Sequence, residues 1–227
     1  MNICIIPARG GSKRIPRKNI KLFNGKPIIA YSIEAALKSN CFDNVIVSTD
    51  DDEIAEIAEK YGAKIPFMRS DKNSDDFATT FEVLEEVINW YKTVGVFYDK
   101  VSCIYPCAPF VTAKKLIQAN KKLKDTGAKS IFTIVKYSYP IQRALKIEGS
   151  NILYENTEFK NSRSQDLEAR YHDAGQFYMM NTEVILEKQE IVGENSAALV
   201  IDELEGQDID TLKDWKLAEL KYQLLNP

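Results

Sequence analysis

The chain has 227 residues, of which 44% are hydrophobic and 28% charged, with a formal net charge of −3 and a pI near 5.4. This composition is that of a soluble globular protein with one sizeable core, and the charge argues against a general nucleic-acid binder. No apolar run approaches the length of a membrane-spanning helix, and the N-terminus lacks the pattern of a secretory signal. The four cysteines are scattered and lack metal-ligand spacing, so we expect reduced thiols and a cytoplasmic protein.

Apolar strand-like segments alternate with amphipathic helical segments up to Val135. We predict strands at Ile3–Pro7, Asn44–Ser48, Lys64–Phe67, Lys100–Tyr105 and Ser130–Val135. Helices are predicted at Pro27–Ser39, Thr49–Gly62, Phe77–Tyr91 and Ala113–Lys124. This alternation predicts right-handed βαβ crossovers, and therefore an α/β fold: a Rossmann-like, mostly parallel sheet with helices on both faces.

Regular periodicity is lost between Tyr137 and Arg170. Within this stretch "LKIEGSNILYEN" predicts a hairpin that turns at residues 148–151, and the polar stretch after it predicts an extended loop or arm. Strands at Gln176–Met180 and Ala197–Ile201 and a helix at Thr211–Leu225 close the chain. The prediction is a single domain spanning residues 1–227, with an inserted arm at about 137–170.

A basic loop follows the first strand. Seven basic residues and no acidic one lie between Arg9 and Lys26. Ligands of open parallel sheets bind beyond the carboxyl ends of strands, which is where this loop is placed. Its spacing matches neither the G-x-G-x-x-G nor the P-loop motif, but two glycines and a serine let backbone and hydroxyl groups face an anion. A solvated surface loop is the alternative; the position after a strand favours a phosphate site.

Several blocks resemble a known family. "IIPARGGSKRIPRKNI", residues 5–20, resembles the opening signature of the cytidylyltransferases that activate nine-carbon acidic sugars, the CMP-sialic acid synthetase family. "GKPIIAYSIEAA", "VIVSTDDDEIAEIAEKYGA", "YPCAPF" and "DIDTLKDWKLAE" resemble further family blocks in the family's order, while "YPIQRALKI" and "RSQDLEARYHDAGQFY" resemble the branch that uses pseudaminic acid. The resemblance implies a fold of the nucleotide-diphospho-sugar transferase type with a small β-rich dimerisation arm.

The same resemblance implies a reaction. CMP would pass from CTP to the anomeric 2-hydroxyl of pseudaminic acid, with release of pyrophosphate. Sialic acid and legionaminic acid are alternative acceptors for the same chemistry. A nucleotide-binding regulatory protein that has lost catalysis is the alternative from another class, and the intact set of Lys13, Lys18, Asp208 and Asp210 argues against it.

Nucleotide-binding and catalytic residues follow from matching the family's motifs. Arg9, Lys13, Lys18 and Asp210 are the expected catalytic residues. The residues expected to bind the nucleotide are Ala8, Arg9, Gly10, Gly11, Ser12, Lys13, Lys18, Asn19, Arg69 and Thr80. For two of them a structural role is the alternative, since Thr80 could cap a helix and Arg69 could pair with Asp71 on the surface.

Two aspartates are the predicted metal ligands. In an extended segment Asp208 and Asp210 face the same way while Ile209 faces the core, and paired carboxylates suit Mg²⁺. From spacing alone Asp210 could equally cap the helix that starts near Thr211; the family's D-x-D motif favours Mg²⁺ binding and a role in deprotonating the attacking hydroxyl. Asp50–Glu53 is predicted to cap a helix rather than to bind metal.

Sugar recognition is expected from the later blocks. Tyr105 stands where sialic acid enzymes carry Gln, and Arg143 or Arg163 could bind the sugar carboxylate. His172, the only histidine, is predicted to make a structural hydrogen bond. The resemblance also implies a homodimer in which exchanged arms close each pocket with residues of the neighbour. The candidate sugar-binding residues are Tyr105, Gln142, Arg143, Arg163, Gln165, Tyr171, Asp173 and Gln176.

Overall fold

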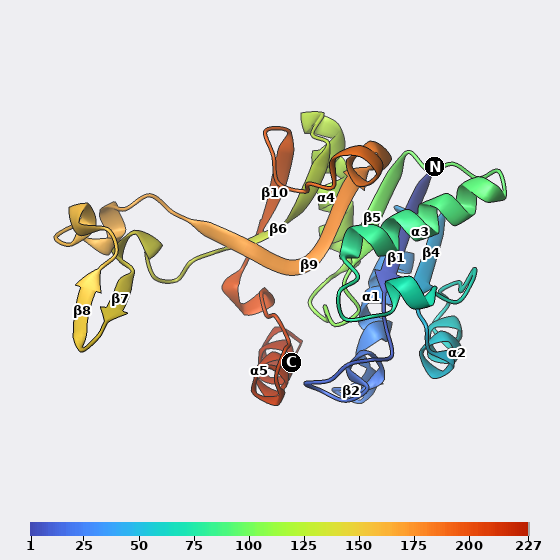
Figure 1. Cartoon of the computed structure of the whole chain (residues 1–227), viewed down its shortest axis with the longest axis horizontal. Helices are drawn as coiled ribbons and strands as arrows, with labels where there is room; N and C mark the ends of the chain where they lie inside the picture. The colour runs from blue at the N-terminus through green and yellow to red at the C-terminus, as the bar shows by residue number, and fades with distance from the viewer. Residues whose placement is uncertain (227) are drawn as a thin grey trace.

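A six-stranded, mostly parallel sheet forms the centre of the molecule, as predicted (Figure 1). The structure is a computed structural model and describes residues 1–226. The strand order is β10-β6-β9-β5-β1-β4; β1 runs parallel to β4 and β5, β10 runs parallel to β6, and β9 is antiparallel to both of its neighbours. The strands are β1 (Asn2–Pro7), β4 (Asn44–Ser48), β5 (Lys100–Ile104), β6 (Ser130–Lys136), β9 (Tyr171–Asn181) and β10 (Ser196–Ile201).

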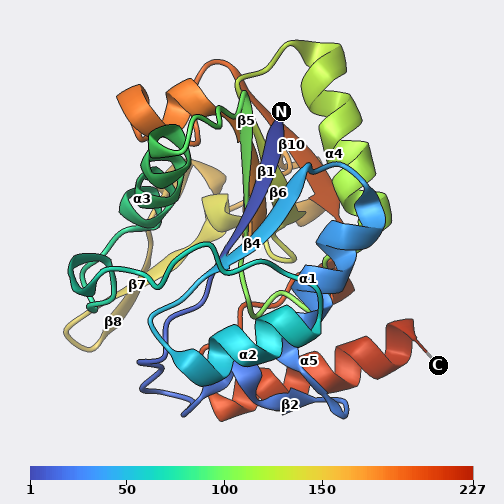
Figure 2. The same cartoon turned by 90° about the vertical axis from the view of Figure 1, so that its right-hand side faces the viewer.

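Helices cover both faces of the sheet, which Figure 2 shows with the sheet between α3 and the pair α1 and α4. None of the helices within residues 1–226 combines the length and apolarity that crossing a membrane requires. The helices are α1 (Ile28–Ser39), α2 (Asp52–Lys60), α3 (Thr80–Thr93), α4 (Ala113–Thr126) and α5 (Leu212–Leu225).

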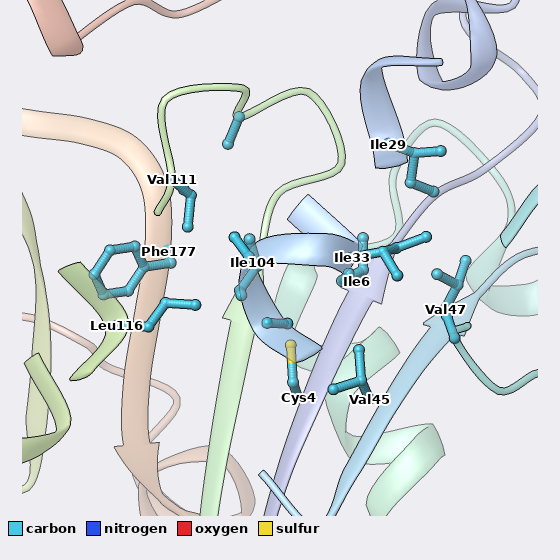
Figure 3. Close-up of a cluster of buried hydrophobic side chains, with 14 of the residues drawn as sticks. Cys4, Ile6, Ile29, Ile33, Val45, Val47, Ile104, Val111, Leu116 and Phe177 are labelled. Carbon is cyan, nitrogen blue, oxygen red and sulfur yellow. The ribbon is translucent and has the colours of Figure 1, made fainter. Parts of the chain in front are cut away.

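The period-two pattern of β1 divides the core into two layers. Cys4 and Ile6 pack with α1, α2 and α4 on one face, together with Phe177 of β9 (Figure 3). Ile3 and Ile5 point to the other face and pack with α3. These four side chains of β1 are fully buried, as expected for a parallel strand covered on both sides.

A hairpin stands away from this body between β6 and β9 (Figure 1). Its strands, β7 (Leu145–Glu148) and β8 (Asn151–Tyr154), pair antiparallel at the position where the sequence predicts a hairpin. Leu145, Ile147 and Ile152 are more than half exposed on it. The hairpin contributes to none of the buried clusters of the sheet, so the arm stands apart from the core of its own chain.

Three local predictions were wrong. Lys64–Phe67 forms no strand; a single parallel bridge joins Lys64 to Ile46. α3 begins at Thr80 rather than Phe77, because Thr79 and Glu82 form a capping box that fixes the first turn. Pro27 is the N-cap of α1 and lies outside its first turn, since it pairs with Leu22 in a small hairpin of β2 (Leu22–Phe23) and β3 (Lys26–Pro27).

Candidate active site

A cavity of about 530 Å³ opens at the carboxyl ends of β1 and β5. The basic loop after β1 lines one side; the segments after β5 and before α5, together with Asp76 and Gly175, line the rest. The predicted position of the loop at this edge of the sheet is therefore confirmed. The lining residues are Pro7, Arg9, Ser12, Lys13, Arg14, Ile15, Lys18, Asn19, Asp76, Tyr105, Pro106, Cys107, Gly175, Gln207, Asp208 and Ile209.

Arg9 and Lys13 are tied to one carboxylate across the cavity. Nη1 of Arg9 donates to Asp76 Oδ1 at 2.8 Å and to the Asp75 carbonyl at 2.8 Å, and Lys13 pairs with the other oxygen of Asp76. Hydrogen bonds from Lys13 and then Arg9 lower the pKa of Asp76. Sequence analysis missed Asp76; its only local signal is the acidic pair in "SDDF", which precedes α3.

Lys18 joins the basic loop to the aspartate pair. Its ammonium donates to the Ile209 carbonyl at 2.8 Å and lies 3.7 Å from Asp210 Oδ1. Asp210 also accepts from Arg14 at 2.7 Å, so Arg14 belongs to this network. The cationic loop and the segment before α5 are thereby held together at the mouth of the cavity.

Asp208 and Asp210 flank a buried Ile209, which is 2% exposed, as the alternation predicts. Asp208 lines the cavity, and within residues 1–226 its carboxylate accepts no hydrogen bond from the protein. Thr211 is the N-cap of α5 and forms a capping box with Asp214, so the capping alternative for Asp210 is wrong. A free carboxylate beside a cation-paired one is a donor set that fits a hard divalent cation.

Gly10 is a glycine because the chain passes too close to Asp51 for any side chain. A Cβ there would lie 2.6 Å from Asp51 Oδ2. The Gly10 N–H was expected to face a bound phosphate; in the structure it donates to Asp50 Oδ1 at 2.9 Å, from the segment that follows the adjacent strand β4. Gly11 has open space around it, and Ser12 N–H donates to the Gly10 carbonyl at 2.9 Å.

The acidic start of α2 is structural, as predicted. Asp51 is its N-cap and accepts from Ile54 N–H at 3.0 Å. Arg17 pairs with both Asp51 and Glu53, and it adopts a left-handed backbone conformation with φ 55°. Arg17 thus anchors the end of the basic loop to α2.

Asn19 is buried beneath the basic loop and hydrogen-bonds to its backbone. It is 5% exposed, its Nδ2 donates to the Arg9 carbonyl at 2.9 Å, and its Oδ1 accepts from Cys107 Sγ at 3.3 Å. Burial raises the pKa of the Cys107 thiol to about 12, so this thiol stays protonated and can donate. Ala8 is fully buried and its N–H donates to the Ser48 carbonyl at 2.9 Å. Both residues shape the loop.

Arg69 and Thr80 lie outside the cavity lining. Arg69 is 7% exposed and donates to Ser48 Oγ at 3.0 Å and to the Ser48 carbonyl, so the alternative of a surface pair with Asp71 is wrong. Burial lowers its pKa. Thr79 caps α3 in place of Thr80, and the Thr80 hydroxyl lies 3.4 Å from the Tyr105 hydroxyl.

The predicted sugar-binding residues fall into two groups. Tyr105 lines the cavity, Gln176 follows the lining residue Gly175 on β9, and Asp173 lies two residues before that glycine. Gln176 is 2% exposed and donates to the Glu205 carbonyl. Tyr171 is 44% exposed at the start of β9, and the neighbouring His172 makes a structural contact, with Nδ1 2.8 Å from the Asp173 carbonyl.

The second group lies in the arm and away from the cavity of the same chain (Figure 1). Gln142 donates to the Glu168 carbonyl at 2.7 Å, and Arg143 reaches Ser164 Oγ at 3.4 Å. Arg163 pairs with Asp166 at 2.7 Å, and Gln165 is exposed. Within one chain, therefore, these four residues do not join the site.

Comparison with known proteins gives relatives over nearly the whole chain. A pseudaminic acid cytidylyltransferase of Campylobacter jejuni is 45% identical over 98% of this chain and 97% of the relative. A CMP-N,N'-diacetyllegionaminic acid synthase of Legionella pneumophila is 33% identical over 98% of this chain and 96% of the relative.

Solved structures show the same fold. CMP:2-keto-3-deoxy-manno-octonic acid synthetase, complexed with CTP, superposes with a TM-score of 0.71 at 18% identity, covering 99% of this chain and 98% of the other. The family model described as "Cytidylyltransferase" matches residues 3–213. With this match and the identities above, the chain belongs to the cytidylyltransferase family.

Proposed function

We propose that this protein transfers CMP from CTP to the anomeric 2-hydroxyl of pseudaminic acid and releases pyrophosphate. The observation that carries the proposal is the cavity itself. Arg9, Lys13 and Lys18 of the basic loop line the same cavity as Tyr105 and Asp208. One space therefore combines a cationic side with a side that carries a carboxylate and an aromatic ring. The 45% identity to the C. jejuni enzyme supports pseudaminic acid as the acceptor.

The cationic side fits a triphosphate and a leaving pyrophosphate. Arg9 offers a planar fork and Lys13 and Lys18 offer point charges, which stabilise the negative charge that builds on the departing group. Ala8, Gly10, Gly11, Ser12 and Asn19 shape the loop that presents them, and we assign Arg69 and Thr80 to the nucleoside end as the family's motifs imply. In-line attack by the sugar hydroxyl on the α-phosphorus is then a matter of positioning and charge.

Asp208 and Asp210 would hold a divalent cation, in keeping with the free carboxylate of Asp208 at the cavity. When bound, Mg²⁺ would neutralise phosphate charge. Asp210 is also our candidate to accept the proton of the sugar hydroxyl. Its carboxylate lies between Arg14 and Lys18, beside Asp208, which lines the cavity.

We infer a homodimer in which the arm of one chain reaches the site of its neighbour. The arm residues Gln142, Arg143, Arg163 and Gln165 stand far from their own cavity, and the hairpin exposes Leu145, Ile147 and Ile152. Sedimentation at micromolar concentration should give twice the chain mass; a monomer would contradict the dimer. The four unpaired cysteines suit a cytoplasmic enzyme.

The test is pyrophosphate release by the purified protein with CTP, Mg²⁺ and one sugar at a time. We expect turnover with pseudaminic acid and little with N-acetylneuraminic acid or N,N'-diacetyllegionaminic acid. Pyrophosphate release with either of those sugars and none with pseudaminic acid would show that the other sugar is the acceptor, while the proposed transfer of CMP would stand. CTP binding without release for any sugar would show the regulatory alternative to be correct.

A further inference from the structure

Arg14 is an exposed arginine at the edge of the cavity, beside the aspartate pair. Its side chain lines the cavity, and its Nη2 donates to Asp210 Oδ1 at 2.7 Å. Within residues 1–226, the Nη1 and Nε groups of Arg14 have no hydrogen-bond partner in the protein. Most of the donors of this guanidinium are therefore available to a ligand in the cavity.

Buried neighbours in the chain fix the position of Arg14. Ile15 is 1% exposed and Ile209 is 2% exposed, and both belong to the same buried cluster. The two isoleucines therefore hold the backbones of Arg14 and Asp210 at one edge of the cavity. The side chain of Arg14 is itself 68% exposed, so it can turn from Asp210 to a ligand without disturbing the core.

The chemistry of the acceptor sugar calls for a cation at this point. In the ring form of a 2-keto sugar acid, the anomeric hydroxyl and the carboxylate are bonded to the same carbon. The group that takes the proton of the hydroxyl and the group that binds the carboxylate must therefore be neighbours. Asp210 is our candidate for the proton, and Arg14 is hydrogen-bonded to Asp210.

The other cations of the cavity fit this carboxylate less well. The Lys18 ammonium lies 3.7 Å from Asp210 Oδ1, but it already donates to a backbone carbonyl at 2.8 Å. It is also a point charge, whereas a planar guanidinium binds both oxygens of a carboxylate. Arg9 has such a guanidinium, but it is paired with Asp76. Arg14 alone combines a free donor fork with a place beside Asp210 within the described lining.

We propose that Arg14 binds the carboxylate of the acceptor sugar in a bidentate pair and so places the anomeric hydroxyl against Asp210. Arg143 and Arg163, the candidates from the sequence, lie in the arm and away from the cavity of their own chain, whereas Arg14 is part of that cavity. This inference rests on the proposed function, since it requires a sugar acid as the acceptor.

The test compares Arg14→Gln with Lys21→Gln, a matched control. Both variants remove one exposed cation of the basic loop, but Lys21 does not line the cavity. We expect Arg14→Gln to raise the KM for pseudaminic acid about tenfold. Its kcat and its KM for CTP should stay within about threefold, because the sugar carboxylate carries the same charge before and in the transition state. Lys21→Gln should leave all three constants nearly unchanged.

A neutral form of the sugar tests the contact directly. The carboxamide of pseudaminic acid keeps the shape of the carboxylate and loses its charge, so the unmodified protein should show about a tenfold higher KM for it than for the acid. Arg14→Gln should lose most of this preference, because the two changes remove the same contact and do not add. Lys21→Gln should keep the preference.

Three results would overturn the assignment. A higher KM for CTP with an unchanged KM for the sugar would place Arg14 at the triphosphate. A fall in kcat alone would leave Arg14 only as a support of Asp210, and an unchanged preference of Arg14→Gln for the acid would exclude the contact.

The proposed function fails separately from this inference. If a different sugar acid is the acceptor, the same comparison applies to that acid and its carboxamide, because each carries its carboxylate on the anomeric carbon. If the unmodified protein released no pyrophosphate with any sugar acid, the proposed function and the role of Arg14 would both fail. Turnover by the unmodified protein with an unresponsive Arg14→Gln would sink the role of Arg14 alone.

Discussion

Nη1 of Arg9 lies 2.8 Å from Oδ1 of Asp76, and the other oxygen of the same carboxylate pairs with Lys13. Asp76 therefore lies where the basic loop would otherwise meet an anion. A triphosphate that binds Arg9 and Lys13 must share them with this carboxylate or displace it. The loop before α3 thus competes for the two cations.

Replacing Asp76 by Asn should strengthen anion binding, because a negative charge leaves the site. We expect the Kd for CTP, and that for inorganic pyrophosphate, to fall about two- to fivefold in calorimetry at low salt. Asp75→Asn is the matched control, since only the backbone carbonyl of Asp75 contacts Arg9. Weaker CTP binding by Asp76→Asn would show instead that the carboxylate holds both cations in a productive arrangement.

Lys18→Met should lower kcat by about 10²-fold, because the ammonium stabilises leaving-group charge, with a modest decrease in Tm from the lost hydrogen bond to the Ile209 carbonyl. Lys21→Met is the control: Lys21 is exposed, with its ammonium over the Trp215 ring at 5.7 Å, and should retain nearly full activity. Rates from pyrophosphate release under saturating CTP test this. A fall in both variants alike would mean that only the general charge of the loop matters.

Removal of divalent cations with EDTA should abolish turnover, and added Mg²⁺ should restore it. Asp208→Asn should raise the Mg²⁺ concentration needed for half-maximal rate by at least about tenfold, since a carboxylate ligand becomes a neutral amide. Asp125→Asn, at an exposed position near the end of α4, should leave that concentration unchanged.

Near-normal rates for Asp210→Asn at saturating Mg²⁺ would show that Asp210 is not the proton acceptor.

Asp51 links the stability of the fold to pH. The hydrogen bond from Arg17 is the main cause that lowers its pKa in the folded protein. The pKa of Asp51 in the folded protein lies below its unfolded value of about 3.9. The pair with Arg17 therefore stabilises the fold above that pH, and the contribution is lost as the pH falls through the folded pKa.

Asp51→Asn keeps a residue able to cap α2 and removes only the charge. We expect a loss of about 1 kcal/mol in the free energy of unfolding at pH 7, discounted for the partial exposure of both side chains, and a smaller difference from the unmodified protein near pH 3. Denaturant titrations at both pH values measure it. An equal loss at both pH values would show that the cap, not the ion pair, was weakened.

The sequence patterns predicted the features that depend on neighbouring residues, such as buried strands and helix caps. The apolar run Ile3–Ile6 of β1 and the acidic start of α2 could be recognised because burial on both faces and helix capping leave their signal in neighbouring residues. The resemblance to the family located Lys18 and the aspartate pair, which the structure joins through Ile209.

What escaped prediction depends on tertiary contacts. Asp76 is 67 residues from Arg9 in the chain, and nothing in "SDDF" indicates which cation it meets. Lys64–Phe67 has the composition of a strand but finds only one bridging partner, at Ile46. The 3.4 Å contact between the Thr80 and Tyr105 hydroxyls leaves no local signal either, because the two residues come from separate elements.

The place of β9 in the sheet has a consequence for how the chain folds. β9 inserts antiparallel between β5 and β6, although both of those strands are made earlier and the arm lies between β6 and β9 in the chain. Until Tyr171–Asn181 leaves the ribosome, facing edges of β5 and β6 have no partner, and unpaired apolar edges template aggregation. Closing such sequence-distant pairs is slow. The two parts of the sheet therefore cannot join until the arm has been made, so the length of the arm sets how long these two edges stay unpaired.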